Sequence, residues 1–383
     1  MADTRNLLLE IGVEEVPARF CQPALDQLKA NAEKALADAR LDYAVADVFG
    51  TPRRLVLYIK DLALVQRDVE VVQKGPSKKV AFDAEGKPTV PAIKFAQSQG
   101  VPVEALEIVK DEKGGEYLYA RRLEQGQSIA KVLPQLLADL VLSIEWPKSM
   151  RWADRTIRYA RPIKWLLAML GDRRVPFEVD GIATVNYTLG HRTLGPKEPI
   201  IVDNADDYFP KVGHGYVMVD QTIRRQVIWQ QIQYEARVAN GYVQPDEDLL
   251  EELTWLVEQP TAFLGSFDRA FLDVPAQVLV TTMKENQRYF PVYNSAEAKE
   301  LLPHFIAVRN GEKDFIEIVR AGNEKVLAAR LSDARFFWDE DRKHTLASFN
   351  DKLRNVVFQE KLGTQLQRVD RLRSLAGKIA DAL

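Results

Sequence analysis

Positive and aromatic side chains alternate in the stretch that begins at Trp146. Between Lys148 and Lys164, Asp154 is the only acidic residue. Cations in such a stretch attract phosphates, and indole or phenol faces stack on unpaired bases. The pattern therefore predicts a nucleic-acid surface, whose candidate contacts are Lys148, Arg151, Trp152, Arg155, Arg158 and Arg161.

A second interpretation of the same stretch is structural. Aromatic side chains of globular proteins are more often buried than used as platforms for bases. The arginines would then be solvated neighbours of core residues, which would be Trp146, Trp152, Tyr159 and Trp165. The apolar runs that follow, at 163–170 and 175–182, flank the turn signal Gly171-Asp172 and predict a β-hairpin.

Two other charged pairs are candidates for chemistry. Glu14 and Glu15 follow a predicted strand at 7–11 and could act as an acid and a base, although adjacent glutamates are usually solvated or ion-paired. Arg53 and Arg54 lie in a turn between strand-like runs at 43–49 and 55–64. They could hold phosphates, but we expect a solvated corner.

The sequence predicts no catalytic residue and no metal site. It lacks the glycine-rich loops that bind nucleotides, the His-Glu-x-x-His zinc motif and the Gly-x-Ser-x-Gly elbow of hydrolases. The four histidines lie far apart in the sequence. Cys21 is the single cysteine, which excludes an internal disulfide and favours a reducing compartment.

Composition is that of a globular protein, with 46% apolar and 28% charged residues in 383. The formal net charge of -3 means that any nucleic-acid surface must be a local patch. The first residues do not have the pattern of a secretion signal, and no apolar run reaches the length of about 20 residues that spans a membrane. We therefore expect a cytoplasmic protein without a membrane contact.

Strand and helix patterns mix without regular alternation, which predicts the α+β class. Residues 73–91 read as an exposed loop, 93–99 as a helix that Gly100 ends, and 108–110 with 117–121 as a hairpin around Lys113-Gly114-Gly115. A helix capped by Ser128 follows. The section 73–143 reads as an insertion.

The second half of the chain becomes helical. Asp220 is expected to cap a long helix that ends at Asn240-Gly241, and helical patterns cover 323–338 and 349–383. We place a domain boundary near 322, which gives domains 1–322 and 323–383. Arg330 and Arg335 are further candidates for RNA, although pairing with nearby aspartates in a surface network is the favoured interpretation.

Several sequence blocks together resemble one family. The chain is similar to the β subunit of the bacterial tetrameric glycyl-tRNA synthetase along its whole length. The blocks that carry the resemblance, in order, are Leu9–Ala18, Gly50–Leu55, Trp146–Arg192, Lys284–Phe290, Ala329–Phe337 and Phe358–Thr364.

The resemblance implies a fold. It implies a B3/B4-like mixed α/β region, followed by the start of an all-helical HD-like domain. A C-terminal anticodon-binding domain would lie beyond Leu383, so we expect the N-terminal part of a longer protein. His344 is followed by Thr345 rather than aspartate, which argues against the metal site that gives HD enzymes their name.

The resemblance also implies a function. The chain would be the tRNA-binding β subunit of a glycine–tRNA ligase, in an α2β2 heterotetramer with the catalytic α subunit. ATP and Mg would be used through the α subunit, and this chain alone would need no cofactor. Two alternatives remain open: a hydrolase acting on aminoacyl-tRNA or as an HD phosphohydrolase, and a structural module that docks on the α subunit.

Overall fold

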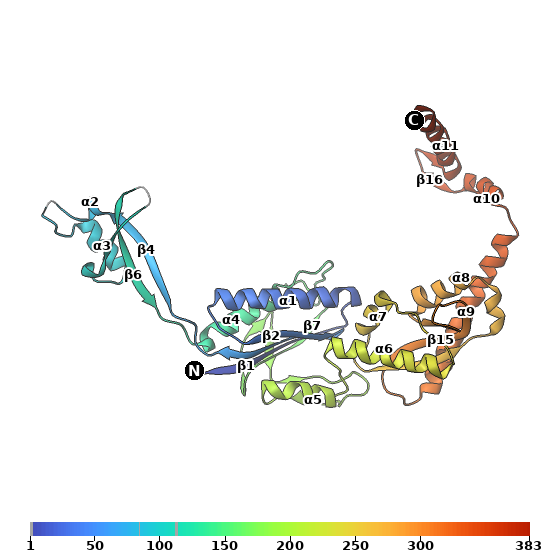
Figure 1. The fold of residues 1–383 in the computed structure, drawn as a ribbon, viewed down its shortest axis with the longest axis horizontal. Coiled ribbons are helices and arrows are strands. Elements are labelled where there is room, and N and C mark those ends of the chain that lie inside the picture. The colour runs from blue at the N-terminus through green and yellow to red at the C-terminus, as the bar shows by residue number, and fades with distance from the viewer. Residues whose placement is uncertain (1–2, 84, 112–113) are drawn as a thin grey trace. The chain divides into compact units, whose positions relative to one another are not determined.

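The computed structural model describes residues 3–83, 85–111 and 114–383, which form two compact units. Unit 1 comprises the chain up to Arg225 together with Thr254–Gln259, and unit 2 comprises Gln226–Leu253 and Pro260–Leu383. Each unit mixes helices with largely antiparallel sheet (Figure 1). The predicted α+β class is confirmed.

Unit 1 is built on a seven-stranded sheet of order β2-β3-β1-β7-β10-β9, with β8 paired to β7. Neighbours are antiparallel except β10, which runs parallel to β7. The strands are β1 (Thr4–Val13), β2 (Val45–Thr51), β3 (Arg54–Ala63), β7 (Ile163–Leu170), β8 (Arg173–Arg174), β9 (Glu178–Val179) and β10 (Ile182–Val185). A separate two-stranded sheet joins β11 (Tyr187–Thr188) and β12 (Ile200–Ile201).

Both faces of this sheet are covered, because successive side chains of a strand point to opposite faces. Leu7 and Leu9 of β1 pack in the core formed with helices α1 (Ala18–Asp38) and α4 (Ile129–Leu142). Leu8 faces the other way and packs in the core formed with α5 (Tyr208–His214). Figure 1 shows α1 and α4 on one side of the sheet and α5 on the other.

The predicted hairpin of 163–170 with 175–182 is wrong in its second half. Strand β7 forms as predicted, but the only part of the second run's side of the turn that pairs with it as an antiparallel strand is the two-residue β8. Pro176 cannot donate to a strand ladder, and Asp180 and Gly181 have positive φ angles of 50° and 79°. The chain therefore turns and returns as β10, parallel to β7.

A small module follows β3 in the chain. Its sheet has the order β4-β6-β5, and Ala81, Ala92 and Leu118 form its core. The exposed loop predicted at 73–91 is wrong for residues 73–81, because Val69–Ser77 pairs with the neighbouring strand and residues 78–81 form a helical turn. The described residues within 82–89 form neither a helix nor a strand beyond one isolated bridge. The predicted helix before Gly100 and the predicted hairpin are confirmed, with Lys113 of the turn outside the described residues. The elements are β4 (Val69–Ser77), α2 (Lys78–Ala81), α3 (Val90–Gln99), β5 (Glu107–Lys110) and β6 (Glu116–Glu124).

Unit 2 contains a three-stranded sheet of order β13-β15-β14. Phe263, Leu279, Phe305 and Leu331 are among its buried core residues. Its strands are β13 (Pro260–Ser266), β14 (Phe290–Tyr293) and β15 (Leu301–Asn310). Its helices include α8 (Ala276–Thr281), a π-helix (Thr282–Asn286) and α9 (Ile316–Arg342), while α6 (Gln221–Val238) and α7 (Glu247–Thr254) begin or end in unit 1.

Two helix boundaries test the sequence patterns. Asp220 Oδ1 accepts hydrogen bonds from Thr222 N at 2.8 Å and Ile223 N at 3.1 Å, so the predicted cap of α6 is confirmed. Residue 322 falls inside α9, and the boundary near it stays a prediction. The continuous helical pattern at 349–383 is interrupted by a small two-stranded sheet; its elements are α10 (Leu346–Lys352), β16 (Val357–Gln359), β17 (Gly363–Thr364) and α11 (Gln365–Ala382).

Four ionisable side chains are enclosed together in unit 1, and we call them the buried ion cluster: Glu10, Arg53, Arg54 and Glu258. Arg54 Nη1 lies 3.1 Å from Glu10 Oε1, and Arg54 Nε donates to Glu258 Oε1 at 3.2 Å. Arg53 Nη1 lies 3.3 Å from Glu258 Oε2. Two positive and two negative charges thus face one another where water has little access.

The buried ion cluster shows that the solvated corner expected at Arg53 and Arg54 is wrong. Arg54 is fully buried in β3 and lies 5.7 Å from the ring of Trp165. Gly12 makes room for that ring, because a Cβ at this position would lie 2.1 Å from it. Both guanidinium groups point into unit 1 and are engaged by carboxylates, so they are not presented to phosphates.

The two carboxyl groups of the cluster titrate differently. Burial acts to raise the pKa of Glu258, but the charges of Arg54 and Arg53 outweigh it and lower that pKa below its usual value of 4.5. Burial also dominates at Glu10, where the charge of Arg54 does not offset it and the pKa is raised. Of the two, Glu258 is therefore the carboxyl group whose ionised form the folded structure favours relative to the unfolded chain.

Strand β13 lies at the edge of the unit 2 sheet, where its outward backbone groups lack a strand partner. Side chains take that place. Gln231 Oε1 accepts from Ala262 N at 2.7 Å, and further contacts continue along the strand. Leu264 N donates to Glu235 at 3.2 Å, and Ser266 N donates to Glu324 at 2.8 Å. Arg320 donates to Leu264 O at 2.7 Å.

We predict that the double variant Glu235→Ala/Glu324→Ala exposes this edge. The amides of Leu264 and Ser266 should exchange about 2- to 10-fold faster, as expected for the loss of one hydrogen bond each. Hydrogen-exchange mass spectrometry of the β13 peptides measures this. Lys325→Ala changes an exposed residue next to Glu324 on α9; it is the control and should leave the exchange rates unchanged. Equal exchange rates in the double variant and the control would contradict the role of the two glutamates.

For the buried ion cluster, we predict that Glu258→Gln lowers the free energy of unfolding by about 3–5 kcal/mol, because it leaves two buried arginines with one carboxylate. Glu10→Gln should lower the free energy of unfolding by less at pH 7, because burial already opposes the charge of Glu10. Urea unfolding followed by tryptophan fluorescence measures both.

The pH dependence of these variants has a defined sign. Folding lowers the pKa of Glu258, so its stabilisation is present above the usual value of 4.5 and is lost as the pH falls; Glu258→Gln should flatten that loss. Folding raises the pKa of Glu10, so the unchanged protein loses stability as the pH rises through that pKa. The free energy of unfolding of Glu10→Gln should therefore rise relative to that of the unchanged protein as the pH rises. Parallel pH profiles with equal losses would contradict this assignment.

Candidate nucleic-acid interface

The cationic stretch forms a closed loop on unit 1, and we call residues 148–161 the basic loop. It lies between α4 and β7. Met150 and Tyr159 pair as an isolated antiparallel bridge, with N···O distances of 2.8 Å and 3.2 Å. The bridge brings the two ends of the loop together, so that residues 151–158 extend from a fixed base.

Asp180, in the turn between β9 and β10, holds the far side of the basic loop. Its carboxylate accepts hydrogen bonds from Ile157 N at 3.2 Å, from Thr156 N at 2.8 Å and from Thr156 Oγ1 at 3.0 Å. These hydrogen bonds, with that of Ile157 the largest contribution, keep the pKa of Asp180 below its usual range. The loop is therefore closed at its base by its own bridge, and Asp180 ties its far side to the turn between β9 and β10.

Three of the predicted arginines donate hydrogen bonds to oxygen atoms of the protein. Arg155 donates to the backbone oxygen of Asp180. Arg158 donates to Ser149 Oγ at 3.1 Å and Ser149 O at 3.0 Å. Arg161 is half-buried and donates to Glu15 O at 3.1 Å and Ala160 O at 3.2 Å. None of these acceptor atoms belongs to a carboxylate, so Arg158 and Arg161 are positioned without an ion pair, whereas the charge of the Asp180 carboxylate acts on Arg155.

Lys148 and Arg151 differ from those three arginines. Both side chains are exposed, and within the described part of the chain neither has a hydrogen bond or an ion pair. A flexible, solvated cation can meet a phosphate without giving up an existing partner. Among the predicted residues of the basic loop, these two are the most available to a ligand.

The aromatic side chains are mostly part of the core. Tyr159 and Trp165 are buried, and Trp146 packs edge-on against Tyr159 at a ring separation of 4.9 Å. Trp152 is half-buried and packs against the same core. The structural interpretation is therefore confirmed for Tyr159 and Trp165, and a stacking role for Trp152 stays a prediction.

The paired carboxylates Glu14 and Glu15 form a surface ion cluster beside the basic loop. Glu14 lies 2.8 Å from Arg192 and 3.7 Å from Lys164, and Glu15 lies 3.6 Å from Arg192. Burial acts to raise the pKa of Glu14, but the hydrogen bond and charge of Arg192 outweigh it and lower that pKa. The ion-paired interpretation of these glutamates is confirmed.

Other candidates from the sequence do not assemble into a site. His191 is buried, and its Nδ1 accepts from Thr193 N at 3.3 Å and Leu194 N at 3.2 Å. Searching the described residues finds no group of three or more His, Cys, Asp or Glu side chains placed to hold a metal ion. Arg335 lies 3.8 Å from Asp339, as the predicted surface network requires.

Sequence reasoning missed the residues that shape the basic loop. Ser149 and Asp180 hold Arg158 and the loop tip, although neither belongs to the cationic pattern. The Asp180-Gly181 pair is a turn signal and could have been found, but nothing in the sequence indicates which loop it binds. None of the described helices is both long and apolar enough to cross a membrane.

Comparison with known proteins gives one consistent result. A family model described as glycyl-tRNA synthetase beta subunit matches residues 7–383. The glycine–tRNA ligase beta subunit of Desulforamulus reducens is 49% identical over 379 residues, which is 99% of this chain and 54% of that protein. The subunit of the same name from Syntrophomonas wolfei is 48% identical over 97% of this chain and 54% of its own length.

A third relative agrees with these two. The glycine–tRNA ligase beta subunit of Moorella thermoacetica is 48% identical over 99% of this chain and 54% of its own length. The chain thus spans about half the length of the curated relatives it matches. The family match extends through both units and includes the basic loop, and on this ground the chain belongs to the family of glycyl-tRNA synthetase β subunits.

Proposed function

We propose that this chain is the N-terminal part of a glycine–tRNA ligase β subunit, which binds tRNA while a separate α subunit attaches glycine to it. The observation that carries this proposal is the family match through residues 7–383, in agreement with relatives at 48–49% identity. The β subunit contributes to a ligase reaction, and this chain alone is not catalytic.

The partners and cofactors follow from the same proposal. The chain works in the cytoplasm as part of an α2β2 heterotetramer with glycine tRNA as its RNA partner. ATP and Mg are used by the α subunit. Residues 1–322 form a B3/B4-like region with 73–143 as an insertion, residues 323–383 begin an HD-like helical domain, and the anticodon-binding domain lies outside this chain.

The basic loop is the part of unit 1 that we assign to tRNA. The free cations Lys148 and Arg151 make the first contacts with phosphates, and Arg155, Arg158 and Arg161 add fixed positive charge near them. Their hydrogen bonds to the protein set the shape of the surface. Contacts of this kind position the RNA but read little of its sequence.

We predict that the double variant Lys148→Ala/Arg151→Ala weakens binding of glycine tRNA and lowers the slope of log K against log salt concentration by about 2, one for each lost phosphate contact. Fluorescence anisotropy with labelled tRNA, titrated across salt, measures both quantities. Lys29→Ala/Lys34→Ala removes two positive charges from α1 and is the matched control, which should keep the original slope.

The same titration separates the alternatives. Equal slopes in the loop variant and the control would mean that the basic loop does not contact RNA, and would favour a module that only docks on the α subunit. Release of amino acid from aminoacyl-tRNA, or of phosphate from a phosphate ester, by the purified chain would instead favour a hydrolase. An unrelated tRNA tested beside glycine tRNA shows how much of the selectivity this half of the protein carries.

A further inference from the structure

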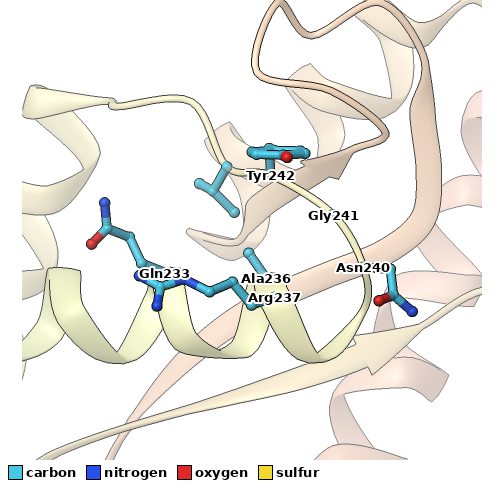
Figure 2. Close-up of a pocket in the computed structure, with 7 residues that line it drawn as sticks. Gln233, Ala236, Arg237, Asn240, Gly241 and Tyr242 are labelled. Atoms are coloured by element: carbon cyan, nitrogen blue, oxygen red, sulfur yellow. The ribbon is translucent and has the colours of Figure 1, made fainter.

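A hollow of about 550 Å³ opens at the end of helix α6 in unit 2. It is lined by the last two turns of that helix and by the segment that follows, and its polar lining residues include Gln233, Arg237, Asn240 and Tyr242. Figure 2 shows Gln233 and Arg237 side by side on the helix, with the ring of Tyr242 on the opposite side of the hollow. This site belongs to unit 2, whereas the basic loop belongs to unit 1.

The position of Tyr242 is fixed by a tight turn. Asn240 has a positive φ of 49°, which ends the helix. Gly241 is packed so closely that a Cβ there would lie 2.4 Å from Val292 Cγ1. Tyr242 then pairs with Tyr293 through two backbone hydrogen bonds of 2.8 Å. Tyr242, which is 52% exposed, is therefore attached to a backbone whose position is fixed on both sides.

The polar groups of the hollow are available to a ligand. In the described structure the side chains of Gln233, Arg237 and Tyr242 make no hydrogen bond or ion pair. The helix dipole favours a cation in the last turn, which accounts for Arg237 on its own. It does not account for an exposed aromatic ring fixed across from that cation, or for a free carboxamide beside it.

We propose that this hollow binds one unpaired nucleotide of RNA. The base stacks on the ring of Tyr242, the carboxamide of Gln233 donates to and accepts from the edge of the base, and the guanidinium of Arg237 meets the phosphate. These three side chains match a ligand that has a flat ring, a polar edge and a negative charge. The RNA is the tRNA of the proposed function, on which this inference rests.

The experiment uses the 383-residue chain and glycine tRNA that carries 5-iodouridine, which crosslinks to aromatic side chains under ultraviolet light. We expect a crosslink at Tyr242, located by mass spectrometry. Tyr242→Ala should weaken tRNA binding about 5- to 100-fold at every salt concentration, as expected for the loss of one stacked base. Arg237→Ala should instead lower the salt slope by about 1.

Matched variants separate stacking from damage to the fold. Tyr242→Phe keeps the ring and should bind tRNA like the unchanged protein. Tyr234→Ala removes an exposed tyrosine of α6 that does not line the hollow, and should also bind normally. If Tyr242→Ala binds as well as Tyr234→Ala and the crosslinks map elsewhere, the hollow is not a nucleotide site.

The outcomes distinguish this inference from the proposed function. Loss of binding in Lys148→Ala/Arg151→Ala with normal binding in Tyr242→Ala would overturn the inference and leave the basic loop in place. The reverse result would support the hollow and overturn the basic loop. If the unchanged chain binds no tRNA at any salt concentration, both are wrong.

Discussion

The pairing of Arg54 with Glu10 and Glu258 is the interaction on which unit 1 depends. A guanidinium without water or a carboxylate is costly to bury, so the residues that surround Arg54 must stay in register with it. Glu10 comes from β1, Arg54 from β3, and Glu258 from a segment about two hundred positions later in the chain. The cluster therefore fixes a long-range connection that apolar packing alone would leave less specific.

The basic loop shows a different use of charge. Arg158 and Arg161 donate to backbone oxygen atoms that carry no net charge, so their hydrogen-bonding capacity is partly used while their positive charge remains. The carboxylates of Glu14 and Glu15, which lie beside Arg161, are paired with Arg192 and Lys164. A chain with a net charge of -3 can in this way present a local positive surface.

The sequence predicts elements better than it predicts the surroundings of charged groups. Periodicity and turn residues were sufficient for β7, for the helix that ends at Gly100 and for the cap of α6 by Asp220. The same reasoning failed for Arg53 and Arg54, because a solvated turn and a buried ion cluster have the same local sequence. The missing signal was Glu10, a charged residue inside the apolar run of a strand, which needs a buried partner.

The basic loop and the hollow at Tyr242 lie in different units and would act on RNA by different physics. Phosphate contacts weaken steeply with salt, whereas stacking on an aromatic ring changes little. If one tRNA engages both, the second contact becomes intramolecular, and its gain depends on whether the RNA can span the two units. The coupling free energy between changes at Arg151 and at Tyr242 therefore reports the geometry of the bound RNA. If both contacts form in one complex without strain, the two losses of binding free energy add. If the two contacts compete, the loss in the double variant differs from that sum.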